Sequence, residues 1–169
     1  LNATLSFSNI ANLTGGSEAD EFDIGLSGSL TGVLDGGTGT DSLNYSLWTS
    51  DVIVNMAMGI APGAVRIASI ENVIGGSGND ILIGDTNVNE LTGGGGKDIL
   101  VGEAGGDTLI GGTGDDTYIL TPGDDDTITE ATGGGNDTLD YSAYMSDNPV
   151  TVDLAAGTAT GTAGVAYIE

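Results

Sequence analysis

Apolar side chains recur every nine residues between Gly75 and Ile119, and this is the most regular pattern in the chain. Each nine-residue block opens with a glycine, at Gly75, Gly84, Gly93, Gly102 and Gly111. Its eighth position is apolar, at Leu82, Leu91, Leu100, Leu109 and Tyr118. A pattern that holds its phase over five blocks indicates a repeat architecture.

The two parts of a block predict two local structures. The first six residues are rich in Gly, Asp and Asn, which favour turns and left-handed backbone conformations. The last three place one apolar side chain between two others, as a very short strand does. Two blocks would then form one coil, and stacked coils would form two parallel sheets with the eighth position inside. We therefore predict an all-β fold, a parallel β-roll or β-helix solenoid.

Stacking at this period places residues that are eighteen apart on the same edge. Asp80, Asp98 and Asp116 would form one column, and Asn89 and Asp107 the opposite one. Carboxylates at the strand spacing of about 4.8 Å repel each other. The chain has only two Lys or Arg residues against 25 Asp or Glu, so a bound cation must supply the charge. Ligation by oxygen alone selects calcium over zinc or copper.

These blocks resemble the GGxGxDxUx nonapeptides of the RTX family, the hemolysin-type calcium-binding repeats that form a parallel β-roll. The resemblance implies several calcium ions, each lying between two same-side turns. It implies side-chain ligands at the sixth positions, which are Asp80, Asp98, Asp116, Asp107, Asn89, Asp41, Asp137, Asp126 and Asp20. It also implies carbonyl ligands from the turn glycines, which are Gly75, Gly76, Gly78, Gly93, Gly94, Gly96, Gly111, Gly112, Gly114, Gly36, Gly37 and Gly39.

The turns match this motif unevenly. Turns 75–80, 93–98 and 111–116 carry glycine at positions one, two and four. Turn 84–89 has Asp85 and Asn87 in place of glycine, and turn 102–107 has Glu103 at position two. We expect well-formed sites on the first edge and weaker ones on the second. The alternative is a Gly-rich surface loop with solvated acids, which does not explain why the acids keep phase with the turns.

The whole chain, 1–169, is interpreted as a single solenoid. Residues 1–44 contain degenerate turns, residues 45–74 a coil with longer strands, and residues 75–130 the nonapeptide roll. Residues 131–169 repeat the turn and the long-strand coil, since 137–147 aligns with 41–51 and 150–161 with 52–63. The chain therefore resembles a window from a longer tandem array; the alternative is a truncated final repeat that acts as a cap.

The composition of the chain excludes several classes of function. The chain has no His and no Cys, so a Ser–His–Asp triad or a thiol nucleophile is impossible, and we predict no enzymatic activity. The carboxylates of Asp124–Asp126 fit a calcium-type turn better than glycoside hydrolysis. A net charge of −23 disfavours nucleic acid as a partner, and no transmembrane run is present.

The resemblance implies a calcium-binding structural module of a secreted or cell-surface protein, an adhesin, matrix or fibre, which folds on binding calcium after type I secretion. Its partners would be neighbouring repeats or copies of itself end to end. One alternative is a head-to-tail filament subunit, because stretches 3–7 and 165–168 are apolar and strand-like. Others are the secretion or folding domain of an RTX enzyme or toxin, and an ice-binding solenoid. The last would need a regular Thr/Asn array, which the third and fifth positions lack.

Overall fold

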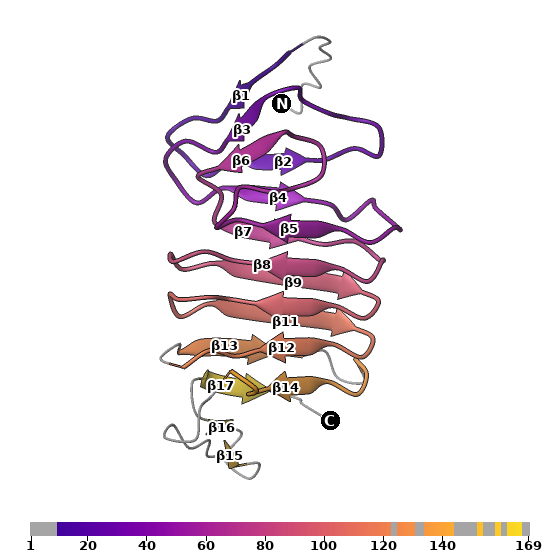
Figure 1. Ribbon diagram of the computed structural model, residues 1–169, viewed down its shortest axis with the longest axis vertical. Coiled ribbons are helices and arrows are strands. Elements are labelled where there is room, and N and C mark those ends of the chain that lie inside the picture. The colour runs from indigo at the N-terminus through magenta and orange to yellow at the C-terminus, as the bar shows by residue number, and fades with distance from the viewer. Residues whose placement is uncertain are drawn as a thin grey trace.

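The chain folds as a ladder of short parallel strands that stack along one axis (Figure 1). A computed structural model describes residues 10–122, 125–130 and 134–143, and the backbone of β15, β16 and β17 beyond them. Stretch 3–7 and most of 144–169 lie outside the described residues. The predicted all-β parallel solenoid is confirmed, and within the described ranges no helix could cross a membrane.

One wall of the solenoid is a continuous sheet of seven strands. In chain order these are β2 (Glu21–Asp23), β4 (Ser42–Asn44), β7 (Asn72–Ile74), β9 (Glu90–Gly95), β11 (Thr108–Thr113), β13 (Asp126–Thr129) and β17 (Thr162–Ala166). All of its neighbouring strands pair in parallel. This sheet links the two ends of the described solenoid.

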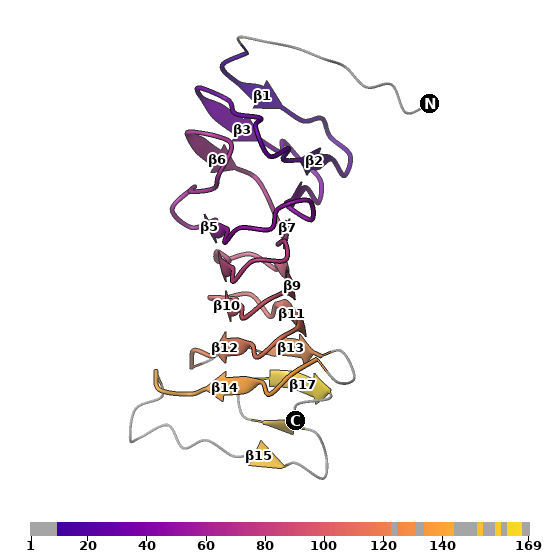
Figure 2. The same ribbon diagram turned by 90° about the vertical axis from the view of Figure 1, so that its right-hand side faces the viewer.

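The opposite wall is divided into two sheets (Figure 2). The five-stranded sheet contains β5 (Ile53–Asn55), β8 (Ile81–Ile83), β10 (Ile99–Val101), β12 (Thr117–Ile119) and β14 (Thr138–Asp140). The three-stranded sheet contains β1 (Leu13–Thr14), β3 (Val33–Asp35) and β6 (Arg66–Ala68). The division falls where the chain departs from the nine-residue period. One sheet of this wall therefore ends and the other begins where the repeat is interrupted.

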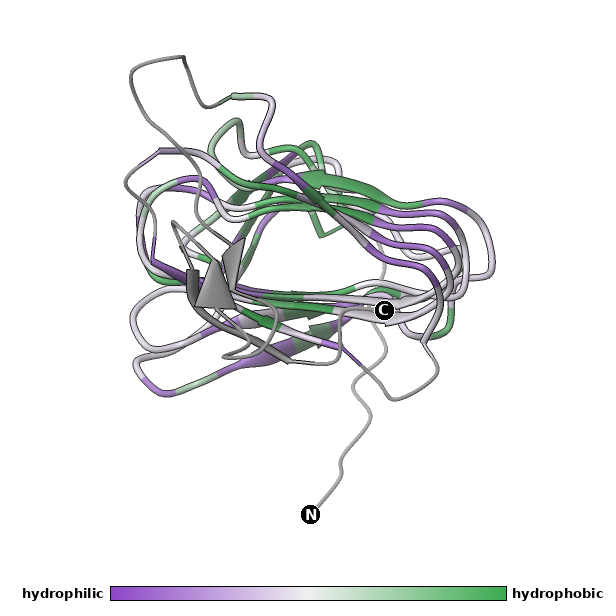
Figure 3. Ribbon diagram, turned by 90° about the horizontal axis from the view of Figure 1, so that it is seen from below, coloured by the Kyte–Doolittle hydropathy of each residue, from purple (hydrophilic) through white to green (hydrophobic). Residues whose placement is uncertain are grey.

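The register places the eighth position of each block inside. Leu100 pairs with Leu82 on one side and with Tyr118 on the other, and Leu109 pairs with Leu91. All five side chains are fully buried, and hydrophobic residues concentrate in the strands of both walls (Figure 3). A pairing offset of eighteen residues follows from two nine-residue blocks per coil, as the sequence predicts.

The coil over residues 45–74 is wider, but the longer strands predicted for it are wrong. Strands β5, β6 and β7 each have three residues, like β8, β10 and β12 of the roll. The extra residues form connections, including an isolated antiparallel bridge between Asn55 and Ile60. Trp48 closes the widened interior, because its ring meets Tyr45 edge-on at 5.6 Å and its Nε1 donates to the Ile24 carbonyl at 2.7 Å.

The same antiparallel bridge occurs again in the second half of the chain. Strands β15 (Val152–Asp153) and β16 (Thr158–Ala159) pair with Asp153 opposite Thr158. Each of these two residues lies 98 positions after Asn55 or Ile60, which is the offset of the longer sequence repeat. The strands that follow differ, since β6 pairs with β3 whereas β17 pairs with β13.

Candidate metal centre

The sixth-position aspartates form a hydrogen-bonded column at the edge where the chain enters the five-stranded sheet, here called the first edge. Each Oδ1 accepts the backbone N–H of the sixth-position residue one coil earlier. Asp98 accepts from Asp80 at 2.7 Å, Asp116 accepts from Asp98 at 2.8 Å, and Asp137 accepts from Asp116 at 3.0 Å. The column begins at Asp80, which accepts the N–H of the apolar Val52 at 2.8 Å.

A second column runs along the opposite edge, where the chain enters the seven-stranded sheet. The same type of bond joins Asp20 to Asp41, Asn89 to Asp107 and Asp107 to Asp126, at 2.8 to 2.9 Å. The structure thus brings together every sixth-position residue that the sequence indicates, in two groups. The second edge is not uniformly degenerate, because it includes the glycine-rich turn 36–41.

Glu71 is a member of this second column that the sequence prediction missed. Its Oε2 accepts the backbone N–H of Asp41 at 2.8 Å, as a sixth-position aspartate would. Its carbonyl accepts the side-chain amide of Asn89 at 3.1 Å. The signal was present in the sequence, since Glu71 precedes strand Asn72–Ile74 and the block-opening Gly75.

The second carboxylate oxygen separates two classes of aspartate. Asp80 Oδ2 accepts the N–H of Gly76 at 2.7 Å, within its own turn. The Oδ2 atoms of Asp41, Asp98 and Asp116 are buried and accept no hydrogen bond from the described residues. A buried charged oxygen without a partner is costly, so each marks a place where a cation would stabilise the fold.

Burial also changes the acidity of the first column. Asp98 is 1% exposed, and burial raises its pKa to about 7. The backbone N–H of Asp80 opposes this shift, whereas the neighbouring charges of Asp116 and Asp80 add to it. Burial likewise raises the pKa of Asp116. A divalent ion between these carboxylates would remove the repulsion that now favours their protonation.

The glycines of the turn bring backbone carbonyl groups to the same edge. Gly94 and Gly96 have φ of 109° and 113°, which strongly favour glycine. A Cβ on Gly94 would lie 2.3 Å from the Gly76 carbonyl oxygen, and one on Gly96 would lie 2.0 Å from that of Gly78. Carbonyl oxygens thus stack from coil to coil beside the carboxylates, and this all-oxygen donor set fits calcium.

The second edge departs from this geometry where its sequence does. Glu103 adopts φ of 70° at position two, a strained conformation for a residue with a side chain. In turn 84–89 the Asp85 carboxylate accepts the N–H of Asn87 at 2.7 Å and so closes the turn itself. The weaker calcium binding expected on this edge remains a prediction.

The chain's own cations do not neutralise the columns. Lys97 Nζ lies 2.5 Å from Asp115 Oδ2, and the two side chains are 67% and 44% exposed. Within the described ranges this is the only ion pair. It joins fifth-position residues at the surface, outside the buried sixth-position column.

Comparison with known families agrees with this geometry. The family model described as RTX calcium-binding nonapeptide repeat (4 copies) matches residues 69–100 and 92–127. These ranges include both columns from Glu71 to Asp126. The comparison with curated proteins gave no match. The chain therefore contains RTX calcium-binding nonapeptide repeats, which form the central part of its parallel β-solenoid.

Proposed function

We propose that this chain is a calcium-dependent structural module of a secreted or cell-surface protein. The observation that carries the proposal is the buried carboxylate oxygen of Asp41, Asp98 and Asp116, which lies in two stacked columns and has no hydrogen-bond partner among the residues that the structure describes. Removing calcium would leave these charges uncompensated, at a cost of several kcal/mol for each. Ion binding and folding would thus be a single event.

The same coupling supports an extracellular location. A chain with net charge −23 repels itself and favours extended conformations until cations bind. Such a chain would stay unfolded where calcium is scarce and fold where it is abundant, which fits type I secretion. We assign no catalytic residues to it. Its role would be to hold neighbouring parts of an adhesin, matrix or fibre protein at a fixed spacing.

A head-to-tail filament subunit is the second candidate. Strands β1 and β2 each pair on one side only among the described residues, so both lie at sheet edges. Near them is a cavity of about 460 Å³, whose apolar lining includes Leu13, Phe22, Ile24, Leu30 and Leu34. Apolar side chains beside strands at the edges of the described sheets favour contact with another solenoid end.

Sedimentation velocity over a calcium series tests both candidates. In chelator the chain should sediment slowly as an expanded monomer, and added calcium should raise its sedimentation coefficient at constant mass. A spacer should then remain monomeric as protein concentration increases, whereas a filament subunit should form larger species only with calcium. An unchanged sedimentation coefficient across the series would contradict the calcium-dependent module itself.

A further inference from the structure

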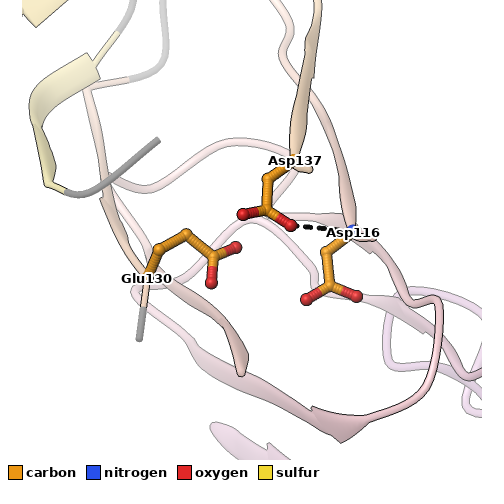
Figure 4. A group of neighbouring side chains, drawn as sticks. All are labelled: Asp116, Glu130 and Asp137. Carbon is orange, nitrogen blue, oxygen red and sulfur yellow. Dashed lines mark hydrogen bonds between the residues drawn. The ribbon is translucent and has the colours of Figure 1, made fainter. Parts of the chain in front are cut away.

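Three carboxylates meet inside the roll near the end of the first edge. Asp116 precedes β12, Glu130 follows β13 and Asp137 precedes β14. One carboxylate oxygen of each lies within 4.8 Å of those of the other two. Figure 4 shows the three carboxylate groups directed toward a common space between their strands.

Glu130 occupies a position that is glycine in the preceding turns of this edge. The pairing of Ile110 with Thr129 aligns Glu130 with the block-opening Gly111. One coil earlier, a Cβ on Gly93 would lie 2.8 Å from the Gly111 carbonyl oxygen. At Gly111 the corresponding neighbour is Glu130 Oε1, at 2.5 Å. A side-chain carboxylate oxygen is thus among the nearest atoms at this level of the column, where a turn carbonyl oxygen is one coil earlier.

The surrounding groups orient these carboxylates without neutralising them. Tyr118, the one eighth-position residue of the five blocks that is not leucine, donates its hydroxyl hydrogen bond to Glu130 Oε1. The hydroxyl in turn accepts the N–H of Gly111 at 2.7 Å. Burial and the hydrogen bond to Glu130 raise the pKa of Tyr118, so the hydroxyl stays protonated.

Two oxygens of the cluster are left without a partner. Glu130 is 3% exposed and Asp116 is 1% exposed. Glu130 Oε2 and Asp116 Oδ2 are buried and accept no hydrogen bond from the described residues. The space therefore requires positive charge.

We propose that Glu130, Asp116 and Asp137 together hold one calcium ion through three side-chain carboxylates. This inference rests on the proposed function, since it assumes that the columns bind calcium. Three hard oxygen ligands at this separation suit a divalent calcium ion. Unlike a site built from turn carbonyls, this one depends on the identity of a single side chain at position one. Tyr118 acts as a positioning residue that fixes the Glu130 carboxylate.

Calorimetric calcium titration of Glu130→Gln tests the proposal, with Glu90→Gln as the matched control on an exposed glutamate of β9. We expect Glu130→Gln to lose one ion, or to bind it at least about tenfold more weakly, the loss typical of even an outer-shell partner. Glu90→Gln should match the parent chain. Equal stoichiometry and affinity in both variants would overturn the Glu130 site, whereas a parent chain that binds no calcium would overturn the proposed function.

Terbium luminescence gives a second readout if Glu130→Gln does not fold. Terbium replaces calcium at oxygen sites and emits when a nearby tyrosine is excited. Tyr118→Leu restores the leucine found at the other four eighth positions, so this variant should fold. We expect it to lose a component of the tyrosine-sensitised terbium emission. Emission that is unchanged in folded Tyr118→Leu would show that no ion lies beside Tyr118 and would contradict the proposal.

Discussion

Replacing Asp98 by alanine is expected to weaken calcium binding and destabilise the calcium-loaded roll more than the same change at Asp107. Asp98 lies between two carboxylates, Asp80 and Asp116, and its buried Oδ2 accepts no hydrogen bond from the described part of the chain. It would therefore contribute to the ions on both sides of it. Loss of one partner from a buried charged group costs about 3–5 kcal/mol, because the remaining charges stay uncompensated.

Asp107→Ala is the matched control on the second edge. Asp107 is as deeply buried as Asp98, and its Oδ1 accepts the same type of bond, from the N–H of Asn89. One of its neighbours in the column is the neutral Asn89, so less repulsion has to be offset there. Calorimetric calcium titrations and urea unfolding in calcium would compare the two variants. Equal losses of affinity and of unfolding free energy would contradict the predicted asymmetry of the edges.

Gly94→Ala is the second change expected to have a large effect. The new Cβ would lie 2.3 Å from the Gly76 carbonyl oxygen, and the residue would have to keep φ at 109°. Backbone strain of this type costs about 1–3 kcal/mol, and overpacking costs a further 1–3 kcal/mol or so. We therefore expect urea unfolding in saturating calcium to show that the free energy of unfolding of Gly94→Ala is about 2–6 kcal/mol lower than that of the parent chain.

The adjacent Gly95→Ala is the control for this prediction. Its new Cβ would have Thr113 Oγ1 as its nearest neighbour, at 3.2 Å. A side-chain hydroxyl can rotate away, whereas the Gly76 carbonyl is fixed by the stacked turns. Gly95→Ala should therefore cost much less than Gly94→Ala. Unfolding of the two variants at the same urea concentration would contradict the close stacking of successive turns at Gly94.

The regular part of the fold could be predicted from the period alone. Nine residues per block require two blocks per coil, and the observed pairing of Leu82 with Leu100 has that offset. The eighth position is buried because one face of each short strand must turn inward. The two columns follow for the same reason, since the sixth position of each of the five blocks immediately precedes a strand.

Features outside the period could not be predicted in the same way. Which edge Asp20 and Asp41 occupy depends on how many strands the irregular residues 45–74 form. The short runs of alternating apolar residues in this segment do not determine that number. Glu71 was missed because its longer side chain replaces the aspartate of the motif, although its Oε2 reaches the same backbone N–H. Glu130 was missed because position one was read as a glycine position, and the carboxylate cluster becomes evident only when three strands meet.

The most direct test of the account is far-UV circular dichroism of the chain with excess calcium and then with excess chelator. Calcium is expected to give a β-sheet spectrum, because ions compensate the carboxylates stacked along both edges. Chelation should convert it to the spectrum of an unfolded chain, and renewed calcium should restore the sheet signal. A β-sheet spectrum that persists unchanged in chelator would contradict the claim that calcium ions hold this roll together.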